Sequence, residues 1–284
     1  MGELKNAKSQ SAMEYLMTYG WAILAIAIVM VSLYSLGIFN LGNLAPTATP
    51  GSCQVIRTAA QTSLAGQCNN LIPKYVGQFN GGYITTGATG FPKGNADISM
   101  FAWINERQAT SYPNVAYITG SGTSAQINTN NATSSTLNPR MCTAGYCWID
   151  SRIFTTNQWA MLGFTYSAST GNVIIYLNGV GGSPLTGGGQ NFQTTSFSIG
   201  AGPRFFNGSI ANVQVYNISL DNATVKALYR EGIGGAPIDV QHIVGWWPLN
   251  GNANDYSGNN NQGTVTNPVV WNANWQSGYT SPAS

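Results

Sequence analysis

Residues 211–216 read Ala211-Asn212-Val213-Gln214-Val215-Tyr216, so apolar or aromatic side chains alternate with polar ones through most of the stretch. A similar pattern occurs in Ser99-Met100-Phe101-Ala102-Trp103-Ile104. Alternation with a period of two is typical of β-strands that have one buried face. Short segments of this kind, separated by Gly and Asn, recur along the chain: Tyr83–Thr86, Ile98–Asn105, Trp159–Ser167, Val173–Leu177, Phe197–Ile199 and Ser209–Tyr216. This pattern predicts an all-β sandwich.

One segment outside these strands has the pattern of a helix. Residues 219–229 carry apolar side chains at Leu220, Val225, Leu228 and Tyr229, and Gly232 follows. This spacing predicts a short amphipathic helix, with Ser219 as its N-terminal cap.

The composition limits the class of protein. The chain has 284 residues, enough for one large sandwich or two small domains. Charged residues make up 7% of the chain, well below the roughly one quarter usual in soluble proteins. The net charge of +2 comes from basic residues that are scattered singly, whereas nucleic-acid binding requires clustered Lys and Arg. The composition therefore predicts a secreted or surface-exposed domain that does not bind nucleic acid.

The four cysteines form two local pairs, Cys53/Cys68 and Cys142/Cys147. An even number of cysteines at short spacings predicts two disulfides in an oxidising compartment. Free buried thiols and a metal site are the alternatives. Neither pair is a CxxC motif, and the single histidine, His242, is remote in sequence and is expected at a turn or on the surface.

Four Asn-x-Ser/Thr sequons fit a glycosylated exterior, although a chain rich in Asn and Thr also produces them by chance. The candidate glycosylation sites are Asn131, Asn207, Asn217 and Asn222.

The N-terminal region is strongly apolar. No charged residue occurs from Tyr15 to Phe39, and Trp21–Leu36 consists almost entirely of aliphatic residues. An uncharged helix of this length spans a hydrocarbon core of about 30 Å. Lys5 and Lys8 precede it, which predicts a cytoplasmic N-terminus and an external remainder. A secretory signal peptide is the alternative.

The stretch Lys8-Ser9-Gln10-Ser11-Ala12-Met13-Glu14-Tyr15-Leu16 resembles the class III signal peptides of archaeal type IV pilin-like proteins. The resemblance implies a leader over residues 1–9, cleavage by a prepilin peptidase between Ser9 and Gln10, and a transmembrane or filament-core helix over residues 10–40. Glu14 would then neutralise the new α-amine of Gln10 on a neighbouring copy. The alternative is a plain single-helix anchor with Glu14 at headgroup depth.

Residues 41–73 are expected to form a linker with a small disulfide loop, because residues 41–52 are rich in Pro, Thr and Gly. The following segments resemble, in order, a laminin-G-like (concanavalin-A-like) domain over residues 74–233. The resemblance rests on Gln78–Ile84, Ile98–Ile104, Val173–Gly179 and Phe206–Asn217. It implies a β-sandwich jelly roll, a fold whose members include carbohydrate binders, adhesion modules and structural spacers.

The C-terminal region departs from the usual order of that family. Residues 245–258 resemble the family's opening strand but come last. Either a second domain begins here or the sandwich is permuted, and about 40 residues are too few to bury a sandwich core of their own. We therefore expect one domain over residues 74–284, in which 243–284 supply a closing strand and cover Trp246, Trp247 and Leu249.

The resemblance also implies a candidate Ca²⁺ site at Asp255 and Asn212. In many members of the family, acidic residues of the last strand also help to hold the cation. The corresponding positions in this chain are Ala211-Asn212. The loss of carboxylates lowers the charge available to a hard cation.

Catalysis is not expected. A glycosidase needs two carboxylates that flank the scissile bond, and no two acidic residues of the outer region share a strand at alternate positions. These residues are Asp97, Glu106, Asp150, Asp221, Glu231, Asp239 and Asp255. Five aromatic residues near loop signals are candidates for sugar stacking or core packing: Tyr112, Tyr117, Tyr146, Trp148 and Trp271. Three are assigned to the core: Trp103, Trp159 and Trp247.

The combined prediction is a pilin-like structural subunit of a cell-surface filament that displays a lectin-like adhesion domain. Its expected partners are the membrane, copies of itself, the prepilin peptidase and surface carbohydrate. The alternative is a singly anchored surface binding protein that does not polymerise.

Overall fold

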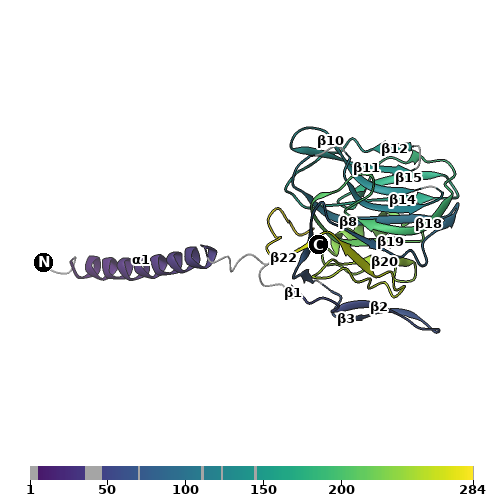
Figure 1. Ribbon diagram of the computed structural model, residues 1–284. Coiled ribbons are helices and arrows are strands. Elements are labelled where there is room, and N and C mark those ends of the chain that lie inside the picture. The colour runs from purple at the N-terminus through teal and green to yellow at the C-terminus, as the bar shows by residue number, and fades with distance from the viewer. Residues whose placement is uncertain are drawn as a thin grey trace. The chain divides into compact units, whose positions relative to one another are not determined.

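The computed structural model describes residues 6–35, 47–69, 71–109, 112–122, 124–143 and 146–283. The chain divides into two compact units, Met1–Ala45 and Pro46–Ser284. The first unit contains the helix α1 (Asn6–Ser35), and the second contains the strands and a short helix (Figure 1).

The described side chains of α1, at Met17 and residues 19–32, are all exposed. Ser9, Gln10 and Glu14 lie within α1, but their side chains are outside the described residues. In the part of the chain that the structure describes, no helix combines the length and the apolar character needed to cross a membrane. The processing and pairing of Ser9, Gln10 and Glu14 stay predictions.

The second unit contains two antiparallel sheets of nine described strands each. We name the first the front sheet; its order is β12 (Tyr146–Ile149), β11 (Thr136–Thr143), β10 (Ala125–Asn131), β9 (Asn114–Gly120), β18 (Phe192–Ile199), β6 (Tyr83–Thr86) and β21 (Gly263–Thr266), with β13 (Phe154–Thr155) beside β11 and β7 (Lys93–Gly94) beside β18.

The second, or back, sheet has the order β16 (Val180–Gly181), β15 (Asn172–Leu177), β14 (Ala160–Ser167), β8 (Ile98–Glu106), β19 (Asn207–Tyr216), β5 (Val76–Asn80) and β22 (Val270–Asn272). β17 (Leu185–Thr186) pairs with β15, and β20 (Ile243–Trp247) pairs with β19. The two sheets form the β-sandwich that the strand pattern predicts.

The main core lies between the two sheets. The inward residues of the front sheet include Ile118, Ile127 and Met141, and they pack in one cluster with residues such as Phe164 and Val213 of the back sheet. Their side chains alternate with outward-facing ones, because successive residues of a strand point to opposite faces.

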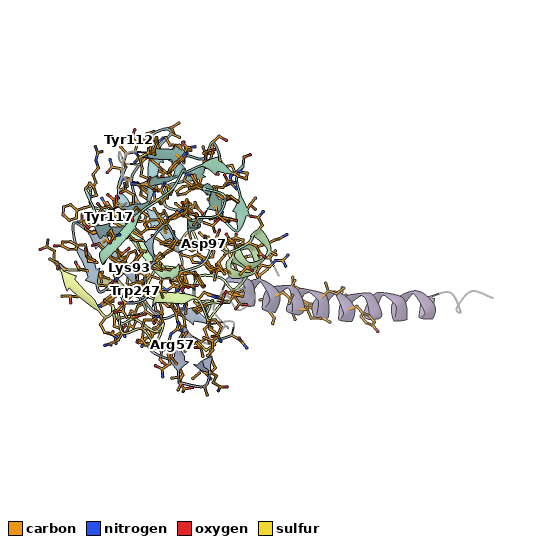
Figure 2. The ribbon with its side chains drawn as sticks, turned by 90° about the vertical axis from the view of Figure 1, so that its right-hand side faces the viewer. Arg57, Lys93, Asp97, Tyr112, Tyr117 and Trp247 are labelled. Atoms are coloured by element: carbon orange, nitrogen blue, oxygen red, sulfur yellow. A yellow bond between two sulfur atoms is a disulfide. The ribbon has the colours of Figure 1, made fainter. Side chains whose placement is uncertain are left out.

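The late strand β20 lies inside this sandwich. Trp247 pairs with Val213 of β19, is fully buried and stacks on Phe197 with ring centroids 4.9 Å apart (Figure 2). The prediction that Ile243–Leu249 supplies a strand beside Ile210–Tyr216 is confirmed by this register.

A second core covers the outer face of the back sheet. Trp103 of β8 stacks on Tyr229 of the helix α3 (Asn222–Arg230) with centroids 5.4 Å apart, and Trp159 packs edge-on against Trp275 of the C-terminal tail. Trp103 and Trp159 are buried, as predicted. The predicted Ser219 cap is wrong, because the Asp221 carboxylate accepts the Thr224 N–H at 2.7 Å and caps α3.

Where we expected a linker, residues 47–73 contain four short strands. β1 (Thr47–Ala48) pairs with β4 (Ile72–Pro73), and β2 (Cys53–Arg57) forms a hairpin with β3 (Thr62–Gly66). The hairpin is tied to the C-terminal region, because Arg57 donates to the carbonyls of Ser257, Val240 and Ile243. Alternation in Cys53–Arg57 buries Cys53 and Val55, so this stretch belongs to the second unit.

Candidate functional site

The two sheets differ in their outer faces. α3 and the C-terminal tail pack on the back sheet, whereas the front sheet presents partly exposed polar side chains at Tyr117, Gln126 and Arg140. No strand of the front sheet, as described, contains Asp or Glu. This face is therefore polar without being acidic.

Strand register places the face residues in rows. Tyr117 lies opposite Gln126, which lies opposite Cys142. In the next row, Asn128 lies opposite both Asn114 and Arg140. Side chains directly opposite on antiparallel strands are about 5 Å apart at Cβ, so residues distant in sequence lie side by side here. Asn114, Asn128 and Cys142 are buried among them.

Three residues form what we name the arginine–tyrosine cluster: Tyr112, Arg140 and Arg204. The Arg140 and Arg204 guanidinium carbons lie 4.1 and 5.4 Å from the Tyr112 ring centroid, within the range of cation–π attraction. Burial lowers the pKa of Arg140; the Tyr112 phenol opposes this shift, and the nearby Arg204 charge adds to it. Tyr112 has φ 62°, in the left-handed region that bulky residues rarely adopt. Such strain is concentrated at functional sites.

The loop that carries Arg204 is fixed to β9. Asn114 Oδ1 accepts the Arg204 N–H at 3.1 Å, and the Asn114 N–H donates to the Arg204 carbonyl at 3.2 Å. The Asn114 amide also donates to Gln126. A Cβ at Gly202 would lie 2.8 Å from Asn114 Cγ and 3.0 Å from Tyr117 Cγ, so only glycine permits the loop to approach this closely.

The predicted disulfide Cys142–Cys147 is present and joins β11 to β12 at opposite positions. Arg140 Nη2 lies 2.7 Å from Cys147 Sγ, which holds the arginine beside the disulfide. Tyr146 is 69% exposed and stacks on Trp148, whose ring also packs against the main core. The disulfide therefore fixes the edge of the candidate face.

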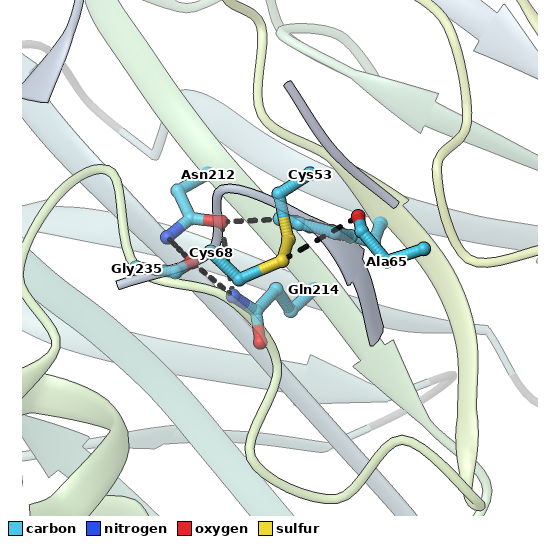
Figure 3. Close-up of a disulfide and its surroundings, with 7 residues drawn as sticks. Cys53, Ala65, Cys68, Asn212, Gln214 and Gly235 are labelled. Carbon is cyan, nitrogen blue, oxygen red and sulfur yellow. Dashed lines mark hydrogen bonds between the residues drawn. A yellow bond between two sulfur atoms is a disulfide. The ribbon is translucent and has the colours of Figure 1, made fainter. Parts of the chain in front are cut away.

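The disulfide Cys53–Cys68 is also present and lies in the second core, close to the network of Asn212, Gln214 and Gly235 (Figure 3). Asn212 donates to the Gly235 carbonyl at 2.8 Å and accepts from the Gln214 amide at 2.9 Å and the Trp246 indole at 2.8 Å.

The proposed calcium ligands do not fit a cation site. The Asp255 carboxylate accepts four hydrogen bonds, from the Trp246 and Asn261 N–H groups and from the Ser257 N–H and hydroxyl. The Asn212 oxygen accepts the two bonds given above. Within the described ranges, no group of three or more His, Cys, Asp and Glu could hold a metal. Asp255 instead accepts a hydrogen bond from the Trp246 backbone N–H, and Asn212 accepts one from the Trp246 indole.

The other candidates are dispersed. Tyr117 is partly exposed on the front face, and Trp271 packs against the main core from β22. His242 lies at a turn, is exposed and contacts Asp239 at 2.8 Å, as expected of a surface residue. The sequons Asn131, Asn217 and Asn222 are exposed, Asn207 is partly buried, and their glycosylation stays a prediction.

Sequence reasoning did not identify Arg140, Arg204, Asn114 or Gln126. They lie in or beside strands rich in Asn and Thr, where alternation is weak. Two signals were present in the sequence: an arginine two residues before a cysteine, and a Gly-Pro-Arg-Phe loop just before a strand.

A search of curated sequences finds no match. A candidate carbohydrate binding protein from Bacteroides ovatus has a similar fold, with a TM-score of 0.55 and 18% identity, over 76% of this chain and 65% of its own length. A pentraxin from Limulus polyphemus has a TM-score of 0.49 and 12% identity, over 69% of this chain and 94% of its own. At these identities the first match shows the fold alone.

A family model described as the concanavalin A-like lectin/glucanases superfamily matches residues 78–226, more than half of the chain. These residues run from β5 into α3, and so include most of both sheets. The chain belongs to the concanavalin A-like lectin/glucanases superfamily.

Proposed function

We propose that the β-sandwich is a non-catalytic carbohydrate-binding domain and that its ligand lies on the outer face of the front sheet. The observation that carries the proposal is the grouping of exposed aromatic rings with amide and guanidinium groups on this face. An aromatic ring packs against the apolar face of a sugar, while Asn, Gln and Arg side chains hydrogen-bond to its hydroxyls. Tyr112, Tyr117, Gln126 and Arg140 supply both kinds of contact.

The distribution of acidic residues supports a binding role over hydrolysis. Glycoside hydrolysis needs two carboxylates about 5 to 10 Å apart on either side of the bond. The front sheet's described strands contain none. Asp150 pairs with Arg152, Asp221 caps α3 and Asp255 is saturated with hydrogen bonds, so these three have structural roles.

The test is a glycan array probed with the full chain and with Tyr112→Ala. We expect Tyr112→Ala to weaken binding about tenfold or more, because an aromatic anchor is lost. Tyr75→Ala is the matched control, since Tyr75 is partly exposed beside Lys74, away from the cluster. An unchanged array signal for Tyr112→Ala, or an equal loss for Tyr75→Ala, would contradict the proposal.

We also propose that α1 assembles the chain into cell-surface filaments, as in the pilin-like family that residues 8–16 resemble. In support, Ile26, Ala27, Ile28 and Val29 are exposed at consecutive positions. Each residue of an α-helix turns by about 100°, so apolar surface surrounds this part of α1 and is suited to packing among other helices. A single-helix anchor that does not polymerise is the alternative.

Two measurements distinguish these assemblies. N-terminal mass spectrometry of the native protein should find Gln10 as the first residue. Glu14→Ala should leave processing intact and reduce the yield of filaments, whereas a monomeric anchor should be unaffected. Filaments that contain the variant at the normal level would rule out the pairing of Glu14 with a neighbour's amine.

A further inference from the structure

The arginine–tyrosine cluster brings two like charges together at one aromatic ring. Arg140 and Arg204 lie close enough for the charge of one to disfavour that of the other. Among the described ion pairs, Arg152–Asp150 and His242–Asp239, none involves Arg140. The described strands of the front sheet contain no Asp or Glu. Two guanidinium groups at one exposed aromatic ring favour a negatively charged ligand.

The Arg140 side chain is partly buried beside Asn128. Its Nε atom is buried and has no acceptor among the described residues. Opposite it on β10, Asn128 is 2% exposed, and its Oδ1 atom is buried without a donor in the same part of the chain. A guanidinium presents its N–H groups as a planar fork that matches the two oxygens of a carboxylate or a sulfate. Arg140 is partly exposed and Arg204 is exposed, so a ligand can reach the guanidinium groups of both residues.

We propose that the ligand of this face is an acidic polysaccharide, whose carboxylate or sulfate groups are bound by Arg140 and Arg204 while a sugar ring packs beside Tyr112. This inference rests on the proposed carbohydrate-binding function and specifies its substrate class. Recognition is local, because charged residues make up 7% of the chain and its basic residues are scattered singly along the sequence.

The first experiment measures binding of the full chain to two matched pairs of polymers. Polygalacturonate and its carboxyl-reduced form differ only in the carboxylate, and dextran sulfate and dextran differ only in the sulfate. We expect binding to at least one acidic polymer to exceed that to its neutral partner by about tenfold or more, and to weaken as salt is added. The pair that shows this difference identifies the acidic group.

Two variants assign the effect to the cluster. Arg140→Gln should remove most of the preference for the acidic polymer, and Lys226→Gln, which removes an exposed charge on α3, should leave it unchanged. Asn128→Asp places a carboxylate opposite Arg140, so it should raise the thermal midpoint and weaken acidic-polymer binding about tenfold. Asn130→Asp, at the next outward position of β10, is its control.

The outcomes separate this inference from the proposed function. Equal binding to acidic and neutral polymers, with loss in Tyr112→Ala, would overturn the acidic ligand and leave carbohydrate binding in place. Acidic preference that survives Arg140→Gln would also overturn the assignment. Absence of binding to all four polymers and to a glycan array would overturn both proposals.

Discussion

The outer faces of the two sheets have opposite character. The back face is apolar and covered: Trp103, Trp159 and Trp246 lie beneath α3, the C-terminal tail and the hairpin β2–β3. The front face carries Tyr112, Arg140 and strained or unsatisfied groups that no described element relieves. The difference teaches that side chains on the back face are positioned for stability, whereas those on the front face stay open for the binding role that we propose.

The largest loss of stability is expected when the C-terminal segment, which covers part of the back face, is deleted. Deleting residues 240–284 removes β20, Trp247 and Trp275, which exposes apolar surface and an unpaired sheet edge. We expect the second unit to unfold or aggregate, as measured by circular dichroism and size-exclusion chromatography. A monomeric product with an unchanged melting temperature would show that the tail is dispensable.

The second largest loss of stability is expected from a single substitution on the back face. Trp103→Ala removes a buried ring that contacts Tyr229 and Tyr279, and should lower the free energy of unfolding by about 3–5 kcal/mol. Urea denaturation measures this change. Ligand affinity under folding conditions should stay unchanged, and a matching loss of affinity would break the separation between the two faces.

The two disulfides give a matched pair, one in the covered core and one on the open face. The cysteines of the two pairs are 15 and 5 positions apart in the sequence, which predicts losses of about 3 and about 2 kcal/mol for the double Cys→Ser variants. Thermal unfolding tests this order. Only Cys142→Ser/Cys147→Ser should also weaken ligand binding, because Cys147 contacts Arg140.

A smaller effect is expected at the cap of α3. Asp221→Ala should cost about 1 kcal/mol, because the N-cap acceptor is lost. The hydrogen bond from the Thr224 N–H holds the pKa of Asp221 below its ordinary value of 3.8. This contribution is therefore present above about pH 4 and is lost as pH falls through the folded pKa. In Asp221→Asn, the free energy of unfolding measured between pH 2 and 7 should lack this pH-dependent contribution. A pH profile equal to that of the unsubstituted protein would contradict the prediction.

The smallest change in stability is expected on the front face. Tyr112 is 38% exposed and strained, so Tyr112→Ala should change the free energy of unfolding by less than about 0.5 kcal/mol. The same variant should show the largest loss of binding. A stability loss similar to that of Trp103→Ala would show that Tyr112 is a packing residue.

Much of the sandwich was predictable from the sequence because its central strands are buried. The predicted segment Tyr83–Thr86 has the limits of β6, and Ser209–Tyr216 lies within β19. β9 to β12 were not predicted, since their outward positions are Asn, Gln, Tyr and Arg and their periodicity is weak. Periodicity also does not show on which face of a sheet a buried side chain packs. Trp103 was therefore expected in a single core, and the second core on the outer face of the back sheet was not predicted.

The candidate site was less predictable for a topological reason. Arg140 and Arg204 are far apart in sequence and meet only through the pairing of β9 with β10 and β10 with β11. The sequence analysis identified Asp255 as a candidate Ca²⁺ ligand, but its role depends on the hydrogen-bond donors that the fold places around it. The four donors that saturate its carboxylate come from residues 246, 257 and 261, and they make it a structural acceptor.

The first strands of the second unit are fastened to residues 243–256, late in the sequence. The Asn250 amide donates to the Ala48 carbonyl at 2.8 Å, Val55 donates to the Tyr256 carbonyl at 2.8 Å, and Arg57 reaches the Ile243 carbonyl. A mechanical pull on residue 46, as a tethered domain would feel while its ligand is held, is therefore passed to the C-terminal segment through several bonds at once. Beyond the hairpin, the Cys53–Cys68 bond limits how far the strands can be drawn out. This arrangement suits a domain that bears load.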